Sequence, residues 1–188
     1  GELHTFKSVD IDAKSYMQDN EKTGYADLPY KLVYQVKSNP NSKASQSNVD
    51  AYVIPVNGMG LWDKIYGYIA IANDGDHVLG TTWYWQKETA GLGANIASKE
   101  WQMLFPGKVI FQKDALGVTD YLHSPIGIFV VRGKVKDIYG NSPKAQSAVD
   151  GMSGATLTGN GVSQAYKESL TPYRKFFTNL HALEKKPS

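Results

Sequence analysis

Three side-chain hydroxyls lie within six positions, at Ser153, Thr156 and Thr158, in a stretch dominated by glycine and other small residues. Small residues with free backbone N–H groups at the start of a helix form a binding site for phosphate. Apolar residues recur at helical spacing after this stretch, which predicts a helix over about Leu157 to Leu170. We therefore expect a phosphate-binding helix start here.

A loop followed by an ordinary capped helix would explain the same composition, with Ser153 or Asp150 as the cap. A further alternative is a hydrolase that uses the hydroxyl of Ser153 or Thr156. Such a hydroxyl is a poor nucleophile without a neighbouring base. The histidines closest in sequence, His123 and His181, have no supporting motif, which makes the hydrolase the weakest of these hypotheses.

The pattern Asp150-x-x-Ser153-Gly154-Ala155-Thr156 resembles the flavinylation motif of FMN-binding domains. This resemblance implies that Thr156 carries FMN through a phosphoester bond, and that the rest of the motif and Thr158 contact the cofactor. No residue of the segment could act as the base, so the resemblance also implies a separate flavin transferase. The helix dipole and glycine N–H groups would then stabilise the phosphodiester.

A second group of residues has the types that a flavin ring requires, which are a flat apolar surface and a few hydrogen-bonding groups. Its members are Trp62, Glu88, Thr89, Gly91, Leu92 and Gly93. Leu92 could press on the ring, while Thr89 and two glycine N–H groups could reach its polar edge. Structural roles alone are also open: Trp62 in the core, Glu88-Thr89 as a surface cap and the glycines in a turn.

The order of these motifs resembles that of NqrC, the C subunit of the bacterial sodium-translocating NADH:quinone reductase. Gly60-Leu61-Trp62 and Glu88-Thr89-Ala90-Gly91-Leu92-Gly93 are followed by Trp101, Gly107-Lys108 and the aromatic tail Pro172 to Phe177, so that the resemblance covers about residues 55–183. Ala90 stands where the family has proline, and Lys87 where it has glycine. The G subunit of the related ferredoxin:NAD electron-transport (Rnf) complexes, which shares the threonine motif, is the alternative.

The resemblance implies a one-electron carrier with covalent FMN, forming the soluble domain of a membrane-anchored subunit of the sodium-pumping NADH:ubiquinone oxidoreductase. It implies other subunits of that complex as partners, an N-terminal membrane helix outside this sequence, and a place on the periplasmic side of the bacterial inner membrane. No Gly-x-Gly-x-x-Gly pattern follows a strand, so we expect no NADH site in this chain. A nucleotide- or phosphate-binding module without redox function is a further alternative.

The composition of the chain excludes several classes of partner and cofactor. The 188 residues include 20 basic and 18 acidic side chains, and this near balance argues against a nucleic-acid partner. The absence of cysteine excludes disulfides, thiolate metal sites and iron–sulfur clusters held by this chain. Four scattered histidines have no metal-ligand spacing, and no apolar run approaches the roughly 20 residues of a membrane span.

The hydrophobic patterns predict one α+β domain, with a mostly antiparallel sheet and flanking helices. We expect residues 1–50 to be an N-terminal helix and strand region with a mobile loop at Lys37 to Asn48, and residues 51–188 to be the FMN-binding core. Strands are expected at Leu28 to Val36, Ala51 to Val56, Lys108 to Gln112 and Ile128 to Val135, with a hairpin of Tyr66 to Ala72 and Val78 to Trp85. Short helices are expected at Asp10 to Glu21 and Lys99 to Phe105, and an amphipathic tail after Pro172.

Overall fold

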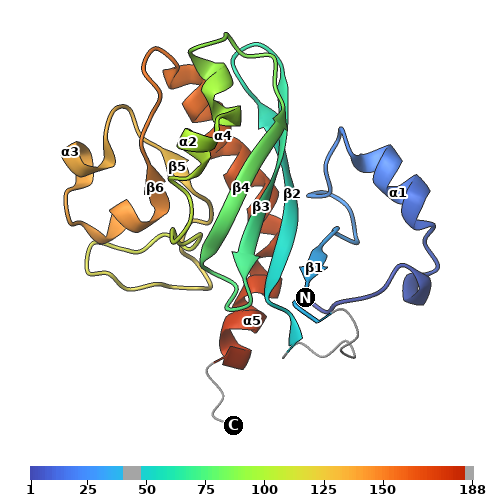
Figure 1. Cartoon of the computed structure of the whole chain (residues 1–188). Helices are drawn as coiled ribbons and strands as arrows, with labels where there is room; N and C mark the ends of the chain where they lie inside the picture. The colour runs from blue at the N-terminus through green and yellow to red at the C-terminus, as the bar shows by residue number, and fades with distance from the viewer. Residues whose placement is uncertain (40–47, 185–188) are drawn as a thin grey trace.

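Four antiparallel strands form the central sheet of the protein (Figure 1), in the order β1-β2-β3-β4. The computed structural model describes residues 1–39 and 48–184. The strands are β1 (Tyr34–Val36), β2 (Ala51–Met59), β3 (Lys64–Ala72) and β4 (Val78–Trp85). Proline lacks the N–H that a ladder requires, and Pro55 is tolerated in β2 because β1 pairs only with Ala51 to Val53.

Alternation of side chains along the strands creates one apolar face of the sheet. On β2 and β3, the residues with fully buried side chains alternate with partly exposed ones. Helix α4 (Thr156–Leu170) packs on this face through Val162, Ala165 and Tyr166, which are buried. The sheet therefore fixes the direction and rotation of the helix that begins at Thr156.

Small residues let α4 approach the sheet closely. A Cβ atom added to Gly58 of β2 would lie 2.5 Å from the Cβ of Ala165. A Cβ atom on Gly161 would lie 2.1 Å from the carbonyl oxygen of Met59. Backbone meets backbone here without intervening side chains, so the start of α4 is held close to the β2–β3 turn.

The remaining elements flank the sheet on both sides. Figure 1 shows α1 to one side of it, and α2, α3 and the β5–β6 pair to the other. Strands β5 and β6 pair in parallel. The bounds are η1 (Lys7–Val9), α1 (Ala13–Asn20), η3 (Gly93–Ala97), α2 (Lys99–Gln102), β5 (Phe129–Val130), α3 (Val135–Tyr139), η4 (Pro143–Ser147), β6 (Ala148–Val149), η5 (Thr171–Tyr173) and α5 (Arg174–Glu184).

The predicted class is confirmed, since the protein is a single domain with a mostly antiparallel sheet and flanking helices. The hairpin of β3 and β4, the short helix within residues 10–21, and the helical turn at Lys99 are also confirmed. The amphipathic tail forms α5, which buries Phe176, Phe177 and Leu180. The predicted loop at Lys37 to Asn48 lies mostly outside the described residues.

Of the strand predictions, the one at Lys108 to Gln112 is wrong, and those at Leu28 to Val36 and Ile128 to Val135 are too long. Within 28–36 only Tyr34–Val36 is a strand. Before it, the backbone carbonyl of Leu32 accepts a hydrogen bond from the Tyr173 hydroxyl at 2.8 Å, so this carbonyl is bound to a side chain and not to a neighbouring strand. Residues 108–112 form no strand, since their N–H groups bind scattered acceptors and only isolated bridges form at Val109 and Phe111. Within 128–135 only Phe129–Val130 pairs, and Val135 already begins α3.

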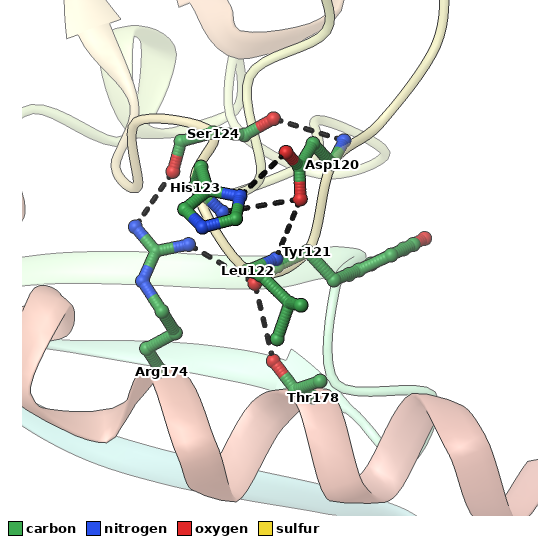
Figure 2. Close-up of polar contacts among 7 residues, drawn as sticks. All are labelled: Asp120, Tyr121, Leu122, His123, Ser124, Arg174 and Thr178. Carbon is green, nitrogen blue, oxygen red and sulfur yellow. Dashed lines mark hydrogen bonds and ion pairs between the residues drawn. The ribbon is translucent and has the colours of Figure 1, made fainter.

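A long loop is fastened to α5 at residues 120–124 (Figure 2). The Arg174 guanidinium donates to the carbonyl of Tyr121 at 3.0 Å and to that of Ser124 at 2.6 Å. Thr178 donates to the same Tyr121 carbonyl, and the Asp120 carboxylate accepts from His123. Charge-assisted bonds of this kind are the stronger hydrogen bonds in proteins, so Arg174 is the main tie between loop and helix.

Residues 1–39 and 48–184 include neither a membrane-spanning helix nor a cluster of metal-binding side chains. No helix there is long and apolar enough to cross a membrane. No group of three or more histidine, aspartate or glutamate side chains is arranged to hold a metal ion.

Candidate functional site

Thr156 is the first residue of α4, and its side chain is exposed. The alternative of an ordinary capped helix, with Ser153 or Asp150 as the cap, is wrong, because the N-cap is Ala155 and no side chain caps this helix. The N–H groups of a first helical turn have no partner within the helix, and the helix dipole places partial positive charge there. An exposed hydroxyl thus lies at an uncapped helix end, whose backbone groups are of the kind that suits an anion.

The three hydroxyls of the motif differ in environment. Thr158 is 1% exposed, and its Oγ1 donates to the Glu88 carboxylate at 2.5 Å. Ser153 is exposed in the loop before the helix. Only Thr156 combines exposure with a place in the first helical turn.

The small residues of the motif are required by the shape of its loop. Gly154 has φ +71°, a left-handed conformation that favours glycine, and Ala155 is buried. A Cβ atom on Gly151 would lie 2.1 Å from the carbonyl oxygen of Val131, so only glycine fits between the loop and that segment. These contacts hold the approach to Thr156 in one conformation.

Asp150 anchors the same loop to its neighbours. Its carboxylate accepts from the N–H of Val135 at 2.8 Å and from the Lys134 ammonium at 3.0 Å, while its carbonyl accepts from the indole of Trp101 at 3.0 Å. Desolvation alone would raise the pKa of Asp150, but the bonds from Val135 and Lys134 outweigh it and hold the pKa below its ordinary value. Asp150 is therefore ionised and fixes the motif from its first residue.

The second predicted motif lies against the first. A Cβ atom on Gly154 would come within 2.9 Å of a terminal carbon of Leu92, so the two loops touch. Gly91, with φ +74°, makes the turn that lets the Leu92 N–H donate to the Thr89 carbonyl at 3.0 Å. Alanine at position 90 is compatible with this turn. We define residues 89–93 as the ring loop.

Glu88 connects the ring loop to two other segments. It is 8% exposed, and its carboxylate accepts from the N–H groups of Leu61 and Trp62, each at 3.0 Å, and from Thr158. Desolvation raises the pKa of Glu88, but the bonds from Thr158 and the two backbone N–H groups exceed this effect and lower it overall. All the predicted site residues are thus brought together around the start of α4.

Three apolar side chains of the two motifs and of the start of α4 are exposed at the surface. Trp62 is 67% exposed, and its indole N–H donates to the Thr89 hydroxyl at 3.1 Å. Leu92 is 39% exposed, and Leu157, directly after Thr156, is 60% exposed. Residues that suit a phosphate thus lie beside Leu92, which suits an aromatic ring, and this set of groups is chemically compatible with FMN.

Sequence reasoning missed three contributors to the site. Leu157 could have been found as the residue after the motif threonine. Lys134 and Val135, which bind Asp150, had no signal, because they are 16 and 15 residues from it and carry no motif.

Known proteins resemble this chain at the level of sequence and fold. The family model for the FMN-binding domain matches residues 60–171. The C subunit of the Na(+)-translocating NADH-quinone reductase of Chlamydia caviae is 41% identical over 195 residues, which cover 99% of this chain and 61% of that protein. The protein of the same name from Vibrio parahaemolyticus is 37% identical over 72% of this chain and 43% of its own length.

Two solved structures share the fold. The crystal structure of Shewanella oneidensis NqrC matches with a TM-score of 0.60 and 26% identity, over 96% of this chain and 78% of that one. The structure of the corresponding C subunit from Parabacteroides distasonis matches with a TM-score of 0.55 and 23% identity, over 94% and 98% of the two chains, and supports the fold alone.

These matches confirm the resemblance to NqrC inferred from the motifs. This chain spans about three fifths of the length of the Chlamydia caviae relative. The family model covers more than half of the chain, including the ring loop, the motif at 150–156 and the whole of α4. This protein belongs to the FMN-binding domain family.

Proposed function

We propose that this chain is the FMN-carrying part of the NqrC subunit of a sodium-translocating NADH:quinone reductase, with FMN joined to Thr156 by a phosphoester bond. The observation that carries this proposal is the position of Thr156, an exposed hydroxyl on an uncapped helix start that touches the ring loop through Gly154 and Leu92.

Each neighbouring group has a role toward the cofactor. The first-turn N–H groups and the dipole of α4 would bind the phosphate oxygens. Leu92 and Trp62 would offer apolar surface to the ring, while the Thr89 hydroxyl and the backbone of Gly91 and Gly93 would bind its polar edge. FMN, when bound, supplies reversible electron uptake; the chain supplies binding, orientation and electrostatics.

Formation of the bond requires a second protein. The Thr156 oxygen would bond to the flavin phosphate of an activated flavin nucleotide, with loss of the hydroxyl proton and of the donor's leaving group. Arg174 follows α4 and contacts the loop that carries His123. This histidine therefore lies beyond the C-terminal end of the 15-residue helix that begins at Thr156. At 1.5 Å per residue, the distance between His123 and Thr156 is roughly 20 Å. We infer that a flavin transferase provides the base, and the same distance argues against the hydrolase hypothesis.

The wider setting follows from the relatives. Their names describe a subunit of a Na(+)-translocating NADH-quinone reductase. We propose that this chain exchanges single electrons with other subunits of such a complex, on the periplasmic side of a bacterial inner membrane, with an N-terminal membrane helix outside this sequence. The partly exposed Trp62, Leu92 and Leu157 would let the flavin edge approach its electron donor and acceptor.

The test is coexpression with a flavin transferase, followed by a denaturing gel viewed under ultraviolet light. Wild type and Ser153→Ala should fluoresce, because Ser153 lies in the loop and not on the helix. Thr156→Ala should be dark. Fluorescence of Thr156→Ala would overturn the attachment site, and reversible binding by a colourless wild type would favour the non-redox phosphate-binding module.

A further inference from the structure

One buried carboxylate holds together three segments that are distant in the sequence. Glu88 binds the turn after β2 through Leu61 and Trp62, and it binds α4 through Thr158. We propose that Glu88 is a positioning residue, which fixes Trp62 and the start of α4 relative to the ring loop and so sets the flavin environment without touching the flavin. This inference rests on the proposed function.

The glycines next to Glu88 show that this arrangement is closely packed. A Cβ atom on Gly60 would lie 2.5 Å from Oε1 of Glu88. A Cβ atom on Gly93 would lie 2.4 Å from Oγ1 of Thr158 and 2.9 Å from Cβ of Glu88. Glycine at both positions makes room for the carboxylate, so Gly60 and Gly93 are required for the same structural reason.

The bonding pattern requires a carboxylate and not an amide. Oε1 accepts from the N–H of Trp62, whereas Oε2 accepts from the N–H of Leu61 and from Thr158. A glutamine must place its NH₂ group, which only donates, against one of these two backbone N–H groups. Either orientation therefore breaks one of the two bonds and leaves a partly buried donor unpaired.

Trp62 is held at two points by adjacent residues. Glu88 accepts from its backbone N–H, and the Thr89 hydroxyl accepts from its indole N–H at 3.1 Å. The side chain is nevertheless 67% exposed. An exposed indole in a fixed orientation is suited to contact with a bound ring, because its position need not be ordered on binding.

On the helix side, Thr158 ties the first turn of α4 to the same carboxylate. It lies two residues after the proposed attachment point, and two residues correspond to roughly 200° of rotation around a helix. Thr156 therefore faces away from Glu88 while Thr158 faces toward it. The bond between Thr158 and Glu88 thus fixes the rotation of the helix and the direction of the Thr156 hydroxyl.

The experiment compares Glu88→Gln, Thr158→Val, Thr158→Ser and the exposed control Lys87→Gln, in the domain coexpressed with transferase. Intact mass first establishes FMN content. Glu88→Gln and Thr158→Val should keep FMN but change its visible absorption maximum and midpoint potential. Thr158→Ser, which keeps the hydroxyl, should restore both values, and Lys87→Gln should match wild type. Unchanged spectrum and potential in Glu88→Gln would overturn the proposal, because a merely structural role lowers stability without moving either.

A second measurement uses the flavin-free domain, so that it stands apart from the proposed function. Amide hydrogen exchange in Glu88→Gln should be roughly tenfold faster at Leu61 or Trp62, since one of these N–H groups loses a charged acceptor. Equal exchange rates in Glu88→Gln and wild type would refute the positioning role. A wild-type domain without covalent flavin would refute the proposed function alone, and the exchange result would still decide whether Glu88 holds these segments.

Discussion

Substitution of Gly161 by alanine sets two physical effects against each other. Gly161 lies inside α4, where alanine is favoured over glycine by about 1 kcal/mol in helix propensity. The added Cβ atom, however, would lie 2.1 Å from the Met59 carbonyl oxygen, whereas real Cβ atoms stay beyond 3.0 Å from such neighbours. Both the helix and the strand are regular backbone at this point, so neither side can yield by rotating a side chain.

The packing effect should be the larger of the two. Overpacking of a close contact costs about 1–3 kcal/mol, and a backbone clash of this kind belongs at the upper end of that range. After subtraction of the propensity gain, we expect a net loss of about 2 kcal/mol in the free energy of unfolding. With a urea slope of about 2 kcal/mol per molar, the unfolding midpoint should fall by about 1 M.

Urea unfolding followed by far-ultraviolet circular dichroism measures this change. Gly80→Ala is the matched control, because a Cβ atom at Gly80 in β4 meets nothing within 4 Å and its midpoint should stay close to that of wild type. Stabilisation by Gly161→Ala would refute the reasoning. It would mean that the close contact with the Met59 carbonyl is absent and that the helix propensity of alanine determines the result. The start of α4 would in that case not be held against the β2–β3 turn.

Three further predictions concern the Arg174 tie, the ring loop and acid stability. Arg174→Gln should lower the free energy of unfolding by about 2–3 kcal/mol, because it removes charge-assisted bonds to the carbonyls of Tyr121 and Ser124; a urea midpoint equal to that of wild type would contradict this. Leu92→Ala in the flavin-loaded domain should change the absorption spectrum and midpoint potential with little loss of stability, since Leu92 is 39% exposed; an unaltered spectrum and potential would mean that the ring loop is only structural. Because the folded-state pKa of Asp150 is lowered, its stabilisation is present above the ordinary value of 3.8 and is lost as pH falls through the lowered value. The urea midpoint of wild type should therefore decline below about pH 4 more steeply than that of Asp150→Asn, and parallel curves would count against this role.

Long, regular patterns in the sequence were sufficient to predict the central sheet and the main helices. The hairpin of β3 and β4 follows from apolar runs on either side of Asn73-Asp74-Gly75-Asp76, and α4 follows from helical spacing. The segment at 108–112 shows where such patterns fail. Its residues are largely apolar, but the N–H of Val109 donates to the Gln146 carbonyl and that of Phe111 to the Asp76 carboxylate. No local pattern shows that these partners are scattered.

The two site motifs were predictable because their residue types are specific, and the structure places them in contact through Gly154 and Leu92. The role of Glu88 was not predictable in the same way. Its partners Leu61 and Trp62 precede it by 27 and 26 residues, and Thr158 follows it by 70. Only the packing of α4 on the sheet brings these groups together. Glu88, for which the sequence also allowed the role of a surface cap, is therefore buried.

Covalent attachment of FMN at Thr156 is the central claim, and peptide mass spectrometry tests it most directly. After coexpression with a flavin transferase, trypsin should release residues 145–167, which contain Ser153, Thr156 and Thr158. We predict that the mass of this peptide increases by one FMN less one water, and that fragmentation places the addition on Thr156. An unmodified peptide, or an addition on Ser153 or Thr158, would contradict the account.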